Sequence, residues 1–176
     1  MNVLTWQFFG AAFTLIAGTL LHFVYGWSDR SLAMAPFAAV NESVWEHLKL
    51  LAEPMLLFAV VEYFCYGRAL PGFLPARTAS VLFGMAEIVV LFYTYAGIVG
   101  RNFLLADILV FCIGVAEAYL LGTYLLLSGL LADGSMQRAA FIALLLLISS
   151  LFFFTFRPPH IGLFRDPVTG RYGTAA

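Results

Sequence analysis

The segment NESVWEHLKLLAEP, residues 41–54, holds the densest group of side chains that could do chemistry. If the segment is helical, four charged residues fall within about 60° of arc on one face. They are Glu42, Glu46, Lys49 and Glu53. His47 lies on the neighbouring face, about 100° from Glu46. Carboxylates beside an imidazole are suited to metal binding or to proton transfer.

A purely structural explanation covers part of this pattern. Ser43 and Glu46 fit the S-x-x-E capping box at the start of a helix, and Glu46 with Lys49 is an ordinary i,i+3 ion pair. Neither explains why Glu42, Glu53 and His47 occur in the same stretch. We therefore keep Glu46 and Glu53 as candidate catalytic carboxylates, with capping as the alternative for Glu46.

The chain has three histidines, which fall near the ends of apolar segments. His22 closes the first apolar segment, on a stripe with Gly10, Thr14 and Gly18 that is suited to close helix packing. Imidazole nitrogens and carboxylate oxygens are the usual donors for Zn²⁺ and similar divalent ions. The sequence predicts one metal site with these ligands: His22, Glu42 (with Glu46 as the alternative), His47 and His160. A single histidine is more often a satisfied core or interface residue, and HExxH spacing is lacking.

A second group of acids lies deeper in the apolar segments. Glu87, Asp107 and Glu117 are candidates for an ion or substrate pathway, because an ionised carboxylate in a membrane is costly and marks a functional site by default. The structural alternative is hydrogen bonding between helices.

The composition places all these residues in a membrane protein. Of 176 residues, 62% are hydrophobic and only 11% are charged, and the mean hydropathy is +0.94. A soluble domain carries about 25% charged residues. The net charge of −1 gives no electrostatic reason to expect nucleic acid binding.

Five segments have the roughly 20 mostly apolar residues that a spanning helix needs. They cover about 3–25, 44–66, 78–99, 103–130 and 137–156. We predict an all-α integral membrane bundle over residues 1–156, followed by a short tail over 157–176. The apolar residues within PPHIGLFRDPVTGRYG predict that this tail docks against the bundle.

Lysine and arginine predict the orientation. With five spans, one side carries Arg30, Lys49, Arg101, Arg157, Arg165 and Arg171, and the other carries Arg68, Arg77 and Arg138. Under the positive-inside rule this places the amino terminus outside and the carboxyl-terminal tail in the cytoplasm.

The chain resembles an uncharacterised family of bacterial multi-pass membrane proteins. The matching residues are HFVYGWSDRS, the block VNESVWEHLKLL and the tail PPHIGLFRDPVTGRYG. The resemblance implies a bacterial origin and a location in the inner membrane, and it implies no particular reaction.

Three functions stay open at this point. The first is a metal-dependent membrane-embedded enzyme that acts on a lipid-linked substrate, with Zn²⁺ as a suitable metal. The second is a proton- or cation-coupled transporter or channel that uses the intramembrane glutamates. The third is a non-catalytic scaffold or accessory subunit. Membrane lipids are the expected partners, a small-molecule substrate is an alternative, and a homo-oligomer stays open.

Overall fold

The computed structural model describes residues 2–175, which form a bundle of five α-helices with a short folded tail. The helices are α1 (Val3–Trp27), α2 (Val44–Cys65), α3 (Phe73–Val99), α4 (Leu104–Ser128) and α5 (Gly134–Phe156). Three short 3₁₀ turns, η1 (Gly67–Ala69), η2 (Gly162–Phe164) and η3 (Gly173–Ala175), lie between and after them. The predicted helical membrane bundle with a docked tail is confirmed.

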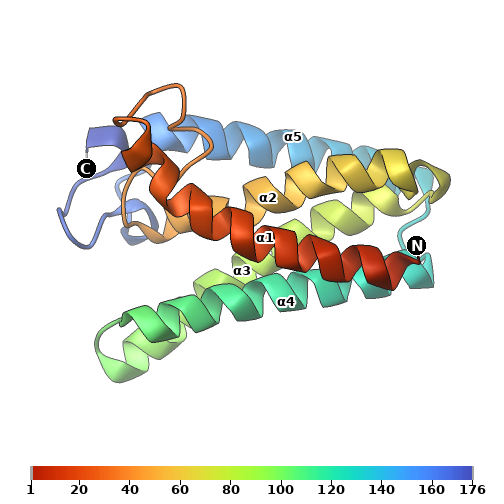
Figure 1. Cartoon of the computed structure of the whole chain (residues 1–176), viewed down its shortest axis with the longest axis horizontal. Helices are drawn as coiled ribbons and strands as arrows, with labels where there is room; N and C mark the ends of the chain where they lie inside the picture. Colours follow the sequence, from red (N-terminus) through yellow and green to blue (C-terminus); the bar gives the residue numbers. More distant parts are fainter. Residues whose placement is uncertain (1, 176) are drawn as a thin grey trace.

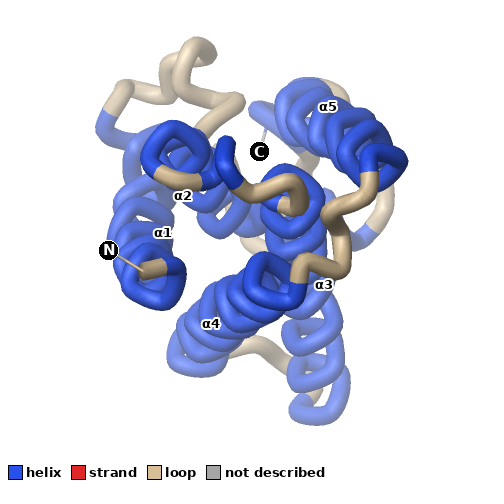
Figure 2. The backbone as a smooth tube through the Cα atoms, turned by 90° about the vertical axis from the view of Figure 1, so that its right-hand side faces the viewer, coloured by secondary structure: helices blue, strands red, loops and turns tan. Residues whose placement is uncertain are grey.

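The helices lie side by side, with the amino terminus at one end of the bundle and the carboxyl terminus at the other (Figure 1). The connection between α1 and α2, the turn between α3 and α4, and the tail all lie at the same end. Seen along the bundle, α1 and α5 lie on opposite sides, with α2 and α3 between them (Figure 2). The His22, Glu42 and His47 side chains therefore lie at this shared end of the bundle.

Local sequence signals set the helix ends. Asn2 caps α1, and its Oδ1 accepts a hydrogen bond from the Thr5 amide at 2.9 Å. Asp133 caps α5 in the same way, and its hydrogen bonds from Ser135 hold the pKa of its carboxyl below the usual value. Gly100 and Gly129 end α3 and α4 with positive φ angles of 79° and 66°.

The third helix begins at Phe73, earlier than the predicted residue 78. Pro75 lies in its first turn, where a proline is tolerated because the amide it lacks would have no helical partner. This extension brings Arg77 into the helix, where it is buried. Arg77 is therefore a residue of the bundle interior and not of the loop in which the sequence placed it.

Four helices, α1, α3, α4 and α5, are long and apolar enough to cross a membrane. Side chains such as Phe8 and Leu120 point outward on them, as expected where lipid is the solvent. The helix α2 has a similar length but carries Glu46, Lys49 and Glu62. All three of these side chains are buried inside the bundle.

Helix α2 also contains Pro54, which has no amide hydrogen to donate to the carbonyl of Leu50 one turn earlier. Gly18 of α1 packs directly on that carbonyl, and a Cβ atom added to Gly18 would lie 2.2 Å from the Leu50 oxygen. The predicted small-residue stripe is thus a contact face, with Gly10, Thr14 and Gly18 all buried. This close approach sets the position of His22, one turn further along α1.

Candidate metal centre

The start of α2 holds Glu42 and His47 in fixed positions. The Asn41 side chain accepts a hydrogen bond from the Ser43 amide at 2.8 Å and donates one to the Gly173 carbonyl at 3.0 Å. Ser43 then caps α2 by accepting from the Glu46 amide. The Ser43 half of the expected capping box is present, whereas the Ser43 amide donates to Asn41 and the Glu46 carboxylate contacts Val40 and Lys49 instead.

The hydrogen bonds of His47 indicate which of its ring nitrogens is available. Its Nδ1 lies 2.9 Å from the Ser43 carbonyl oxygen, which can only accept, so Nδ1 carries the hydrogen. The other nitrogen, Nε2, points away from the backbone and lies 3.5 Å from Oε2 of Glu42. A backbone carbonyl that fixes the tautomer in this way is the usual support for a metal-binding histidine.

His22 of α1 completes the group. Its ring centroid lies 5.1 Å from that of His47. One of its ring nitrogens, Nδ1, is buried without a hydrogen-bond partner in the described part of the chain. Buried polar atoms normally have a hydrogen-bond partner. The Nδ1 atom of His22 has none among the described residues, so a partner would have to come from outside them.

The three residues offer ligand atoms that all lie within 4.8 Å of one another. Ligand atoms about 2.0–2.2 Å from a tetrahedral metal are roughly 3.3–3.6 Å apart. The Glu42–His47 separation of 3.5 Å already matches this, and the three ligand atoms together lie within a somewhat wider 4.8 Å. Two histidines and one glutamate form a ligand set known from catalytic zinc sites, in which water takes the fourth position.

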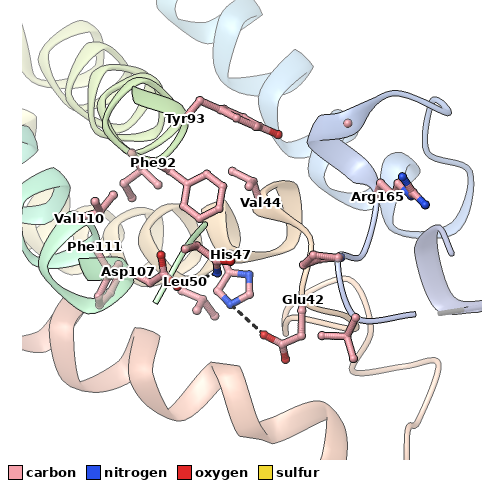
Figure 3. Close-up of a pocket in the computed structure, with 15 residues that line it drawn as sticks. Glu42, Val44, His47, Leu50, Phe92, Tyr93, Asp107, Val110, Phe111 and Arg165 are labelled. Atoms are coloured by element: carbon pink, nitrogen blue, oxygen red, sulfur yellow. Dashed lines mark hydrogen bonds and ion pairs between the residues drawn. The ribbon is translucent and has the colours of Figure 1, made fainter. Parts of the chain in front are cut away.

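The group lies at the edge of a pocket of about 700 Å³. Glu42 and His47 line one side of it, and Phe92, Val110 and Phe111 of α3 and α4 line another (Figure 3). The pocket also touches the tail. Its remaining lining residues are Val44, Leu50, Ile88, Tyr93, Asn102, Asp107, Gly162, Arg165, Pro167 and Val168.

Asp107 is the second carboxylate that lines this pocket. Tyr95 donates a short hydrogen bond to its Oδ1, and the Asn102 amide donates to its Oδ2 at 3.0 Å. Tyr95 lies in the last turns of α3 and Asn102 in the turn that follows, so Asp107 is held at the rim. The sequence placed Asp107 on an ion pathway, and the structure places it on the wall of the pocket that Glu42 and His47 also line.

Glu46 is buried and occupied by other contacts. Its Oε2 lies 2.6 Å from Nζ of Lys49 and accepts a hydrogen bond from the Val40 amide at 3.1 Å. Glu53 lies further along α2, half-buried and within electrostatic reach of Lys49. Neither glutamate lines the pocket. Their catalytic role stays a prediction.

His160 does not join the other two histidines. Its ring stacks on Tyr172 within the tail, with centroids 4.5 Å apart, and it is exposed. The group of candidate ligands in the described residues contains His22, Glu42 and His47 and does not include His160. The tail folds on itself here, because the backbones of Arg165 and Tyr172 pair across a turn.

Glu87 and Glu117 are half-buried within α3 and α4. No hydrogen bond or ion pair joins either of them to another described residue, so they form no continuous chain with Asp107.

Sequence reasoning missed a buried polar cluster at the opposite end of the bundle. Arg77 lies 2.5 Å from Glu62, which also accepts hydrogen bonds from Gln7 at 3.0 Å and from Tyr66 at 2.7 Å. The guanidinium also lies over the ring of Tyr119 at 5.6 Å. These residues come from four helices or their ends, so nothing in their local spacing indicates the cluster.

The fold and the site together define a polytopic helical membrane protein with a His/Glu group at one end of its bundle. The chain matches the model of "Family of unknown function (DUF6512)" over residues 1–174, and it belongs to this family. The comparisons with curated proteins and with solved structures gave no match. The expected membership of an uncharacterised membrane protein family is confirmed.

Proposed function

We propose that the protein is a membrane-embedded, metal-dependent hydrolase that acts on a lipid-linked substrate. Its metal is a divalent transition ion such as Zn²⁺, held by His22, Glu42 and His47. One observation carries the proposal: three ligand atoms within 4.8 Å of one another lie at the edge of a largely apolar pocket. Imidazole and carboxylate donors suit Zn²⁺ and its neighbours in the first transition row.

The residues around the pocket supply the parts of a hydrolytic reaction. His22, Glu42 and His47 would hold the divalent ion, which would supply Lewis-acid activation of a water molecule. Asp107 accepts the proton of the attacking water as general base and then returns it to the leaving-group oxygen. The water oxygen forms a bond to the acyl or phosphoryl centre as the bond to the leaving oxygen breaks. One ester and one water thus give one acid and one alcohol.

Metal content tests the metal site directly. We expect detergent-purified protein to retain zinc in a stoichiometric amount, measured by elemental mass spectrometry after dialysis. His22→Ala, Glu42→Gln and His47→Ala should each lose most of it, since removal of one ligand leaves two donors for an ion that requires at least three from the protein. His160→Ala is the matched control, because His160 lies outside the group. It should retain the metal.

Two results would overturn the metal site. Wild-type protein without stoichiometric metal after reconstitution with zinc would remove it, and so would equal retention in His47→Ala and His160→Ala. The scaffold and ion-pathway alternatives both predict that outcome.

For the reaction, Asp107→Asn should keep the metal and lose turnover of lipid esters or phosphoesters in nanodiscs. Mass spectrometry of the released products measures this turnover. Turnover that is unaffected by this change would exclude Asp107 as the general base.

A further inference from the structure

The pocket beside the candidate metal centre is divided into an apolar part and a polar part. Its apolar walls are Leu50 of α2, Ile88 and Phe92 of α3, and Val110 and Phe111 of α4. Its polar residues lie in or near the ends of the same helices and in the tail. They are Glu42, His47, Asn102, Asp107 and Arg165.

The division runs along the helix axes. His47 lies in the first turn of α2 and Asp107 in the first turn of α4, both at the end where the tail packs. Ile88 lies eleven residues before Val99, the last residue of α3, which is roughly 16 Å at 1.5 Å per residue. That depth is about half of the roughly 30 Å hydrocarbon core of a bilayer.

The tail covers the pocket at its polar end, where Gly162, Pro167 and Val168 line it. This cover is anchored, because Phe164 is buried between the rings of Trp45 and Phe154, with centroids 4.8 Å and 5.3 Å away. Tyr93 of α3, in contrast, lines the pocket and is 44% exposed. The pocket is therefore open beside Tyr93.

We propose that this pocket binds a membrane amphiphile with a long hydrocarbon chain and an oxygen-containing head group. The chain lies between α2, α3 and α4 and enters from the bilayer past Tyr93. The head group lies at the rim, between His47 and Asp107. The match of polarity supports this ligand class, because an apolar cavity that descends from a polar rim towards the bilayer centre has the same polarity profile as a lipid. A volume of about 700 Å³ also falls within the range of small-molecule sites.

The amphiphile would be the substrate of the hydrolase proposed above, and only that statement rests on the proposed function. Binding of the chain is a separate property, since none of the apolar walls belongs to the metal group. The two are therefore tested with different readouts, chain binding by photolabelling and metal binding by elemental analysis.

The test uses the full chain in phosphatidylcholine nanodiscs that contain a lipid with a photoreactive diazirine in the middle of its acyl chain. One arm uses a diazirine phosphatidylcholine and the other a diazirine free fatty acid, so the arms separate a diacyl lipid from a single-chain ligand. After irradiation, labelled peptides are mapped by mass spectrometry. We expect peptides with Phe92 and Val110 to be labelled several-fold more than the outward-facing positions of the same helices, such as Ile98 and Leu120.

Substitutions that change the pocket volume give the controls. Val110→Trp fills the pocket and should reduce its labelling several-fold, while Leu120→Trp, on the lipid-facing surface of the same helix, should leave it unchanged. Phe92→Ala enlarges the pocket and should increase labelling at Ile88. The Phe92→Ala variant keeps the test decisive if Val110→Trp fails to fold.

The proposal is overturned if pocket positions are labelled no more than Ile98 and Leu120 in both arms, or if neither pocket variant changes the labelling. Repeating the experiment with His47→Ala protein in a chelating buffer separates the two proposals. Pocket labelling that persists there supports chain binding even if the metal site fails. Full metal content without pocket labelling overturns chain binding alone.

Discussion

At the scale of single residues, Lys49 is the most completely enclosed charge among the described residues, with no exposed surface. Its ammonium group donates to the carbonyls of Ala35 and Ala38 at 3.0 Å and 3.3 Å, and it contacts Glu46 and Thr155. The first two belong to the connection between α1 and α2, and Thr155 belongs to α5. A single cation thus ties three parts of the chain together at the end that carries the candidate metal centre.

We predict that Lys49→Met strongly destabilises the protein, because it leaves the Glu46 carboxylate buried without its cation. Breaking one partner of a buried ion pair costs about 3–5 kcal/mol. The double variant Glu46→Gln with Lys49→Met should lose less, since no unpaired charge remains. Unfolding in mixed detergent, followed by circular dichroism, measures both. Arg101→Met, an exposed charge at the same end, serves as control and should change stability by less than about 0.5 kcal/mol.

If the double variant were as unstable as Lys49→Met alone, the unpaired Glu46 carboxylate would not be the cause of the lost stability. In that case the carbonyl contacts of Lys49, and not the unpaired carboxylate, would account for the effect.

Single residues also show how far the sequence could predict the site. Residue type and helical spacing were enough to predict that Glu42 and His47 lie together and that His22 belongs with them. The position of His160 could not be predicted, because it depends on a turn within the tail that stacks it on Tyr172. The carbonyl partners of Lys49 could not be predicted either, because their positions depend on the fold of the irregular connection between α1 and α2.

At the scale of elements, the contact between α1 and α2 positions the candidate metal ligands. Pro54 leaves the carbonyl of Leu50 without a helical donor, and Gly18 packs on that oxygen. His22 follows Gly18 by one turn, while Leu50 follows His47 by about one turn, so the two histidines are brought together by this crossing. The helix contact and the His/Glu group depend on the same pair of backbones.

We predict that Gly18→Ala destabilises the protein by about 1–3 kcal/mol, the usual cost of overpacking. The added Cβ would lie 2.2 Å from a backbone oxygen, so the helices themselves must move. Gly97→Ala in α3 is the matched control. Beyond the neighbouring backbone of its own helix, no atom lies within 4 Å of its added Cβ, and alanine favours a helix over glycine by roughly 0.5–1 kcal/mol. The two substitutions should therefore act in opposite directions in the same unfolding assay.

The Gly18 variant should also retain less metal than the Gly97 variant, because a shift of α1 carries His22 with it. Equal stability and equal metal content in the two variants would contradict a tight crossing at Leu50.

The elements themselves were predictable because long apolar runs bounded by glycine, proline and charge have few alternatives in a membrane. The start of α3 was misplaced since Arg77 and Pro75 suggest a loop when taken alone. In the bundle, Arg77 pairs with Glu62 of α2, and that distant partner is what makes an arginine acceptable inside the helix.

At the scale of the whole molecule, α2 is the helix that decides how many times the chain crosses the membrane. Its charges keep it out of the set of apolar helices, yet each of its two outer carboxylates has a buried cation. Glu46 pairs with Lys49 near one end, and Glu62 pairs with Arg77 near the other. The two glutamates are sixteen residues apart on one helix, or roughly 24 Å, which fits within a bilayer core of roughly 30 Å. We therefore expect α2 to be a fifth span, with its charged side chains buried inside the bundle and Leu57, Val60 and Phe64 exposed on its outer face.

The burial of Lys49 and Arg77 also changes the charge count that sets orientation, because neither is free to face water. The exposed cations at the tail end are Arg30, Arg101, Arg157, Arg165 and Arg171, and those at the other end are Arg68 and Arg138. Five against two gives the same direction as the count from the sequence. The positive-inside rule therefore still predicts that the tail end faces the cytoplasm.

Cysteine accessibility tests the fifth span and the orientation together. In a background with Cys65→Ser and Cys112→Ser, Leu32→Cys places an exposed thiol in the connection that precedes α2, and Ala69→Cys places one just after α2. In intact cells a membrane-impermeant maleimide should label Ala69→Cys, and it should label Leu32→Cys and Thr174→Cys only after permeabilisation. Labelling of Leu32→Cys and Ala69→Cys from the same side would mean that α2 does not cross, and the reverse pattern would mean that the tail end faces outward. If α2 crosses, every ligand of the candidate metal centre lies at one membrane surface, within reach of a lipid in a single leaflet.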